Sequence, residues 1–184
     1  MAITRITSPA ITSVASTAIS GTLPAANIND TSISNITALP AGVGGKVLQV
    51  VQGSTTSQTN SSSTTLADTG LTATITPSST SSKILVIVHQ NGIEKTSDSA
   101  QNDMKLVLLR NSTNISNIVV FSMYENEAKP NNGQTLSHAY LDSPNTTSAT
   151  TYKTQFSRPD GSGTVRCQSS STMSSITLME MSSW

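Results

Sequence analysis

The stretch Lys83-Ile-Leu-Val-Ile-Val-His-Gln90 is the part of this chain that says most about its fold. It holds five consecutive apolar residues, four of which are Ile or Val. Ser-rich sequence precedes it and Asn91-Gly92 follows it, so the run is too short for a helix of ordinary length. β-Branched side chains pack well on a pleated surface. We therefore expect a central β-strand that is buried on both faces, with further strands wrapped around it.

Similar short apolar runs recur at regular intervals between about residues 46 and 181. The expected strands are 46–52, 71–76, 83–90, 104–110, 115–122, 136–141, 152–157, 164–168 and 176–181, with a weaker one within 61–67. Turn-forming sequence separates them, and Pro159-Asp-Gly-Ser-Gly163 predicts a tight hairpin. Many short strands without a helical pattern predict an all-β fold, most simply a jelly-roll-like β-sandwich. The long connections 91–103 and 123–135 carry seven of the 20 charged residues and are expected to be exposed loops.

Residues 1 to about 40 are repetitive. Blocks of eight residues open on Ile3, Ile11 and Ile19, and a further block opens on Ile33. The prolines and the many Ser and Thr residues argue against a helix. A segment of this length cannot bury one apolar stripe by itself, so a second copy of the chain is its simplest partner. The residues expected to support oligomerisation and docking are Ile3, Ile6, Ile11, Val14, Ile19, Ile28, Ile33 and Ile36. The alternative is a disordered linker whose repeat is an accident of low complexity.

Glycines divide the chain into two parts. In Ala41-Gly-Val-Gly-Gly-Lys46, three glycines in four positions allow a sharp change in the course of the backbone. We predict an extended, repetitive shaft or docking segment at 1–44 and a β-sandwich head domain at 45–184.

The composition excludes several classes of protein. The 184 residues carry a net charge of +0 and only 11% charged residues, which gives no electrostatic footprint for nucleic acid or for an anionic membrane. No apolar run is long enough to cross a membrane, and the N-terminus lacks the apolar core of a signal peptide. The single cysteine excludes an intrachain disulfide. These features favour a surface β protein that is assembled in the cytoplasm of a cell and released by lysis.

No pattern in the sequence indicates catalysis, a metal or a cofactor. His89 and His138 lie in or beside predicted strands without further metal-ligating residues at suitable spacings, so structural roles are expected. Cys167 is expected to pack as a small apolar residue. Asp98 and Asp103, with Glu94 nearby, could bind calcium, but their spacing does not match an EF-hand, and a solvated loop is the better interpretation. We therefore predict no enzymatic activity.

Three segments resemble one family. Ile19-Ser-Gly-Thr-Leu-Pro-Ala-Ala-Asn-Ile-Asn-Asp-Thr-Ser-Ile-Ser-Asn-Ile-Thr-Ala-Leu-Pro40 resembles the repetitive N-terminal segments of tail-fibre and other appendage proteins of bacteriophages, particularly those that infect cyanobacteria. Gly45-Lys-Val-Leu-Gln-Val-Val51 and Ile176-Thr-Leu-Met-Glu-Met181 are similar to the start and the end of the β-sandwich heads attached to such segments. The resemblance implies a homotrimer located in the virion. Its N-terminus would attach to other virion proteins and its head would face outward.

The sequence therefore predicts a phage virion structural protein, a trimeric fibre or spike on the tail or head that binds the host surface, with a glycan as one candidate partner, or decorates the particle. The candidate binding residues lie in the charged loops and are Glu94, Lys95, Asp98, Glu125, Glu127 and Lys129. The alternative is a stand-alone carbohydrate-binding adhesin module, which would be a monomer with exposed aromatic residues. A glycan-degrading spike would need two converging carboxylates, and the scarcity of acidic residues argues against it.

Overall fold

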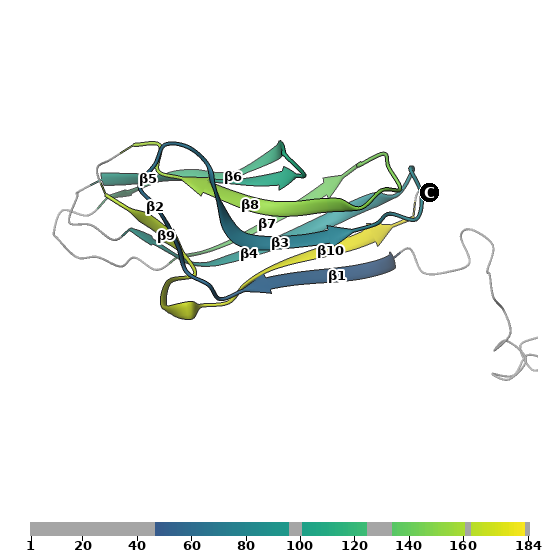
Figure 1. Ribbon diagram of the computed structural model, residues 1–184, viewed down its shortest axis with the longest axis horizontal. Helices are drawn as coiled ribbons and strands as arrows, with labels where there is room; N and C mark the ends of the chain where they lie inside the picture. The colour runs from purple at the N-terminus through teal and green to yellow at the C-terminus, as the bar shows by residue number, and fades with distance from the viewer. Residues whose placement is uncertain (1–46, 96–100, 125–133, 161–162, 183–184) are drawn as a thin grey trace, which may run out of the picture. The chain divides into compact units, whose positions relative to one another are not determined.

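The computed structural model describes residues 47–95, 101–124, 134–160 and 163–182 (Figure 1). The chain divides between Gly44 and Gly45, within the glycine-rich run. The residues predicted to support oligomerisation and docking, from Ile3 to Ile36, lie outside the described part. The account below concerns the domain that begins at Gly45.

The described residues form ten strands and one short 3-10 turn. In chain order these are β1 (Val47–Thr55), β2 (Thr59–Ser61), β3 (Ala67–Ile75), β4 (Lys83–Lys95), β5 (Gln101–Arg110), β6 (Thr113–Tyr124), β7 (Gln134–Asp142), β8 (Thr150–Ser157), β9 (Val165–Cys167), the turn η3 (Ser169–Ser171) and β10 (Ser174–Met181). Nine of them overlap the strand segments expected from the sequence. The weak strand expected within 61–67 is replaced by β2 and by the beginning of β3.

The strands form two antiparallel sheets that pack against each other (Figure 1). The first has the order β1-β10-β4-β9-β2, with β7 paired to the other edge of β4, and the second has the order β3-β8-β5-β6. When the short strands β2 and β9 are set aside, eight strands remain. The first sheet then has the order β1-β10-β4-β7, which are the first, eighth, third and sixth of these eight, and the second sheet has the order β3-β8-β5-β6. This is the order of a jelly roll. The predicted all-β, jelly-roll-like sandwich is therefore confirmed.

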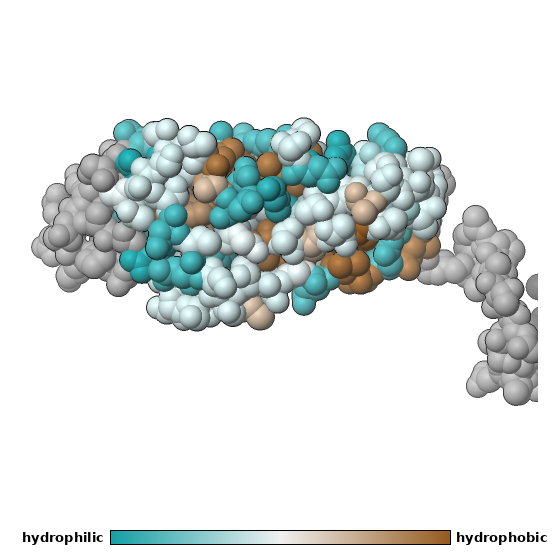
Figure 2. Space-filling view, in the orientation of Figure 1, coloured by the Kyte–Doolittle hydropathy of each residue, from teal (hydrophilic) through white to brown (hydrophobic). Residues whose placement is uncertain are grey.

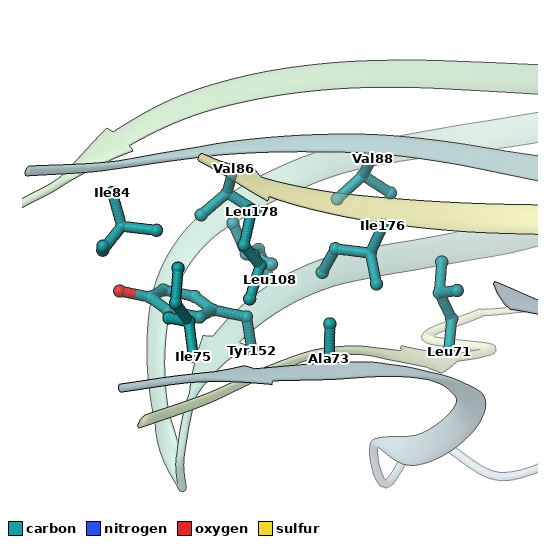
Figure 3. Packing of buried hydrophobic residues seen from close by; sticks show 10 residues of the cluster. All are labelled: Leu71, Ala73, Ile75, Ile84, Val86, Val88, Leu108, Tyr152, Ile176 and Leu178. Carbon is teal, nitrogen blue, oxygen red and sulfur yellow. The ribbon is translucent and has the colours of Figure 1, made fainter. Parts of the chain in front are cut away.

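Alternating side chains of the two sheets meet in the core. Ile84, Val86 and Val88 on β4 point toward the facing sheet, whose buried residues alternate along β3 in the same way (Figure 3). The core cluster consists of Leu71, Ala73, Ile75, Ile84, Val86, Val88, Leu108, Tyr152, Ile176 and Leu178. A second cluster toward the other end of β4 contains Ile93, Met104, Leu106, Phe156, Val165 and Cys167. Alternation of this kind along β3, β8 and β10 gives each sheet one core face and one outer face.

A buried hydrogen-bonded network also joins the two sheets. The Gln90 amide on β4 accepts a hydrogen bond from Thr154 Oγ1 on β8 at 3.0 Å and donates one to Ser174 Oγ on β10 at 3.2 Å. Thr69 Oγ1 lies 2.5 Å from Thr154 Oγ1, and the Gln168 amide lies 3.0 Å from Ser174 Oγ. Because each of these buried groups has a partner, the network fixes the register of the strands without a large desolvation cost.

Two expectations about β4 are wrong. The strand is not buried on both faces, because Leu85 and Ile87 lie on the outer face of the sheet and are only half-buried. It also does not end at Asn91-Gly92. Gly92, with φ of 60°, forms a bulge between Gln90 and Ile93, after which the strand continues to Lys95. The glycine therefore bends the strand instead of ending it.

The hairpin predicted at Pro159–Gly163 is also wrong. β8 pairs with β3 and β5 in one sheet, whereas β9 pairs with β2 and β4 in the other. The chain therefore crosses between the sheets in this segment. A tight hairpin does join β5 and β6, where Arg110 pairs with Thr113 and Asn111 adopts a φ of 54°. Asn is one of the few residues that tolerate this left-handed conformation, so its position at the turn has a local cause.

Candidate functional site

The charged residues predicted to form binding loops do not form one exposed site in the described part. Glu94 and Lys95 are the last residues of β4 and are buried, so their predicted place in an exposed loop is wrong. Glu94 accepts a hydrogen bond from Ser169 and forms an ion pair of 3.1 Å with Arg166 on β9. These contacts hold the end of β4 to the adjacent strand and turn. The other four candidates, Asp98, Glu125, Glu127 and Lys129, lie outside the described residues.

The two histidines take part in separate hydrogen bonds. His89 on β4 is exposed on the outer face of the first sheet, with Nδ1 2.8 Å from Ser137 Oγ. His138 on β7 has Nε2 3.0 Å from Ser116 Oγ and its ring stacks on Tyr140. Among the residues that the structure describes, no group of three or more His, Cys, Asp or Glu side chains is placed to hold a metal ion.

Cys167 is fully buried in the second apolar cluster. Burial raises the pKa of the thiol well above its usual range, so the thiol stays protonated at neutral pH. Because the thiolate is the reactive form of cysteine, this residue is chemically inert in the folded protein. The predicted packing role of Cys167 agrees with this position.

Asp142 is the centre of a polar cluster at one end of the core. Arg110 Nη1 donates to both of its carboxylate oxygens at 3.0 Å, and the buried Tyr152 hydroxyl donates to Oδ2 at 2.6 Å. Burial, followed by the hydrogen bond to Asp142, raises the pKa of Tyr152 above its usual range. The cluster anchors β5, β7 and β8 to one another, and all its members are engaged in that structural role.

Glu180 has a similar structural role between β10 and the segment that follows β3. The buried carboxylate accepts hydrogen bonds from the Ser78 backbone N–H at 2.7 Å, from Ser78 Oγ at 2.6 Å and from Gln49 Nε2 at 2.6 Å. Burial by itself raises the pKa of Glu180, but these hydrogen bonds to the charged form outweigh it and hold the pKa below its usual range.

Acidification is therefore expected to destabilise the protein in part through Glu180. A carboxylate whose pKa is lowered by folding contributes stability above the pKa that it has in the unfolded chain, and this contribution is lost as the pH falls through the folded pKa. Denaturant unfolding of Glu180→Gln at pH 7 and at about pH 3 should show a smaller loss of stability between the two than the wild type shows. Asp68→Asn is the control. Asp68 also has a lowered pKa, but its side chain is 55% exposed, so this substitution should change the pH dependence less than Glu180→Gln does. If the pH dependence of stability in Glu180→Gln equals that of the wild type, the Glu180 carboxylate does not contribute to the acid sensitivity of the protein.

A small pocket lies on the outer face of the second sheet. Its volume is about 140 Å³, and it is lined by Asp68, Gly70, Leu71, Thr72 and Lys153. Gly70, with φ of 81°, lies where the pairing of β3 with β8 shifts register, so the pocket follows from a bulge. Lys153 and Asp68 form an ion pair of 2.9 Å across it. Pockets for drug-sized ligands measure roughly 300–1,000 Å³, so this volume does not indicate a site of that kind.

The outer face of the first sheet carries a row of apolar side chains. In the register of the strands, Val50 on β1 lies opposite Met179 on β10, Met179 opposite Leu85 on β4, and Leu85 opposite Leu141 on β7. Val50 is 57% exposed and Leu141 is 56% exposed. Four apolar side chains therefore form a continuous row across four strands.

Apolar residues continue on both sides of this row. Val47 lies opposite Met181 toward one end of the sheet, and Ile87 lies opposite Ala139 toward the other. We call these eight residues the apolar face: Val47, Val50, Leu85, Ile87, Ala139, Leu141, Met179 and Met181. In Figure 2, hydrophobic atoms (brown) gather at the lower right of the view, where Figure 1 places the start of β1. The sequence signal for this face was the unbroken apolar run of β4, which we interpreted as burial on both faces.

No family model matches the chain, and no curated protein matches it. In the part of the chain that the structure describes, no helix has the length and hydropathy needed to cross a bilayer.

Proposed function

We propose that this protein is a virion structural protein of a bacteriophage, a homotrimeric fibre or spike that attaches by its N-terminal segment and presents the jelly roll outward. The observation that carries the proposal is the combination of an Ile-led repeat of eight residues with a jelly-roll domain directly after a glycine-rich boundary. The repeat offers an apolar stripe that needs partners, and the sandwich offers a rigid surface for loops. The proposed location is the virion and the proposed partners are two further copies, other virion proteins and the host surface.

Several features of the described domain support a binding role over a catalytic one. The buried ionisable residues Glu94, Asp142 and Glu180 each hold neighbouring strands or loops through hydrogen bonds or ion pairs. Tyr152 lies in the core cluster and Tyr140 packs against this cluster, so both rings are used in packing. A neutral surface rich in Ser and Thr suits a particle surface that is exposed to solvent.

The test is to locate the protein on particles and to measure its mass. Antibodies against the full chain, used with gold labelling in electron microscopy, should mark a fixed position on virions released by lysis of the cells that carry the gene. Light scattering should give three times the 19.2 kDa chain mass. Virions without label, or a stable monomer at micromolar concentration, would contradict the proposal.

The N-terminal stripe supplies a matched pair of variants. Replacing Ile11 and Ile19 together by Ser should remove both the labelling and the trimeric mass, because it deletes two leading apolar residues of the repeat. Replacing Thr12 and Ser20 together by Ala changes adjacent polar positions in the same blocks and should leave both unchanged. Equal behaviour of the two double variants would show that the stripe is not the docking element.

A further inference from the structure

We infer that the apolar face of the first sheet is the surface through which copies of this chain pack against one another. The inference rests on the proposed function for the number of copies, but the surface itself is identified from the register and exposure of the strands. It assigns a role to residues that neither the core nor any hydrogen bond in the described domain explains.

The first step of the argument is the position of these residues. An antiparallel sheet with one solvated face normally alternates apolar and polar side chains along each strand. β4 departs from this rule. Its outward residues Leu85 and Ile87 are apolar, as are the core residues on its inward side. On β10, the outward residues Met179 and Met181 are apolar as well. Strands that are apolar on both sides are typical of sheets that are covered on both sides.

The second step is the extent of the face. Neighbouring strands lie about 4.8 Å apart and successive outward residues about 6.8 Å apart, so each position takes about 33 Å² and the eight residues span roughly 260 Å² in the plane of the sheet. Soluble monomers rarely expose contiguous apolar patches larger than a few hundred Å², and the largest patch on a monomer is often functional. A stable interface buries about 800 Å² on each partner, so the apolar face supplies the centre of one.

The third step is the rim. Gln52 and Thr177 lie in the same cross-strand row as Ile87, and Gln52 Nε2 donates to Thr177 Oγ1 at 3.0 Å. The next row is polar as well, with His89 beside Ser137. At the other end Lys83 Nζ donates to Ser143 Oγ at 2.6 Å. An apolar centre with a hydrogen-bonded polar rim is the usual anatomy of a protein interface. Because the apolar face itself contains no charged residue, two copies of it can meet without an unpaired buried charge.

The fourth step selects a second copy as the occupant. Val47 is both the first residue of β1 and a member of the apolar face. It is preceded by 46 residues that carry the Ile-led repeat. Copies held together by the repeat would have their β1 strands begin close to one another, so their apolar faces would be present at high local concentration. Two such uncharged apolar faces can then associate with little added entropic cost.

The experiment compares two introduced thiols in the full chain. Val50→Cys lies on the apolar face and Val120→Cys lies on β6 of the second sheet. The two valines are 57% and 59% exposed in a single copy, and both belong to strands at the edge of a sheet. The native Cys167 is buried and gives little background. If copies cover the apolar face, the thiol at position 50 should react at least about tenfold more slowly with a thiol reagent than the thiol at position 120.

A charge on the apolar face provides the second arm. Adding Leu85→Lys to Val50→Cys should restore the rate of the position-50 thiol to within about twofold of the position-120 thiol, because a lysine would be buried in the interface. Val120→Lys, added to Val50→Cys in the same way, should leave the protection unchanged. Light scattering and the melting temperature are recorded for every variant, so that loss of the fold is recognised.

Each outcome decides the inference. Slow reaction in a species of several chain masses, relieved by Leu85→Lys, supports it. Equal rates at positions 50 and 120 overturn it, and so does protection in a monomer of 19.2 kDa, which would show that the chain covers its own face. Particle labelling is measured separately. Protection without labelling would leave the inference standing while the proposed function fails, and labelling with equal rates would do the reverse.

Discussion

Val86→Asp is expected to give unfolded or insoluble protein, whereas Ile87→Asp is expected to leave the sandwich folded. Val86 points into the core and is 0% exposed, between residues of both sheets (Figure 3). An unpaired carboxylate at that position costs several kcal/mol even after relaxation, which is comparable with the whole stability of a domain, about 5–15 kcal/mol. Ile87 points to the outer face, where the carboxylate would remain partly hydrated in a single copy.

The two variants differ by one position and carry the same new side chain, so each is the control for the other. Solubility and the melting temperature of the two proteins check the prediction. Similar unfolding in both would mean that the outer face is as dry as the core under the conditions of the measurement. Normal melting of Val86→Asp would contradict the facing of β4 in the structure.

Gly92→Ala is expected to lower the free energy of unfolding by about 2–5 kcal/mol. The positive φ of 60° costs an L-residue about 1–2 kcal/mol, and overpacking of a filled site costs about 1–3 kcal/mol more. A Cβ at this position would overlap Thr172 Oγ1 and the backbone nitrogen of Ser169, which belong to the segment packed against the bulge. That backbone cannot move away without disturbing the hydrogen bond from Ser169 to Glu94.

Gly70→Ala separates the two contributions. Gly70 also has a positive φ, of 81°, but the nearest atom to an added Cβ is Thr55 Oγ1 at 3.8 Å. Only the conformational cost of about 1–2 kcal/mol is expected there. Denaturant unfolding of the two variants and the wild type measures both values. Equal destabilisation would show that packing at the β4 bulge contributes nothing beyond backbone conformation.

The buried acidic residues illustrate how a chain with few charges uses them. Glu94 joins β4 to β9, Asp142 joins β7 to β5 and β8, and Glu180 holds the segment after β3. Each accepts bonds from at least two partners, so its burial does not leave an unpaired charge. The stability of this domain therefore depends on acidic residues whose side chains solvent hardly reaches.

Local sequence determined which segments become strands. The Ile and Val run of Lys83–Gln90 and the looser alternation of Leu71–Thr76 and Ile176–Met181 each predict a strand. The first and third lie within strands of the structure, and the second lies within β3 except for Thr76. The absence of a helical pattern, together with many turn-forming stretches, was enough to predict a β-sandwich. These features are local, because side-chain shape and the period of apolar residues act over a few neighbouring residues.

Tertiary structure alone decided what lies on each side of those strands. The sequence cannot show whether Gly92 ends a strand or bends it, since that depends on the segment packed against it. It cannot show that Glu94 and Lys95 are buried, because β9 and the turn that follows it cover them from a distant part of the chain. The row Val50, Met179, Leu85 and Leu141 exists only because the jelly roll places β1, β10, β4 and β7 side by side. Cross-strand neighbours are set by register between distant segments, and a residue's own neighbours in sequence do not encode that register.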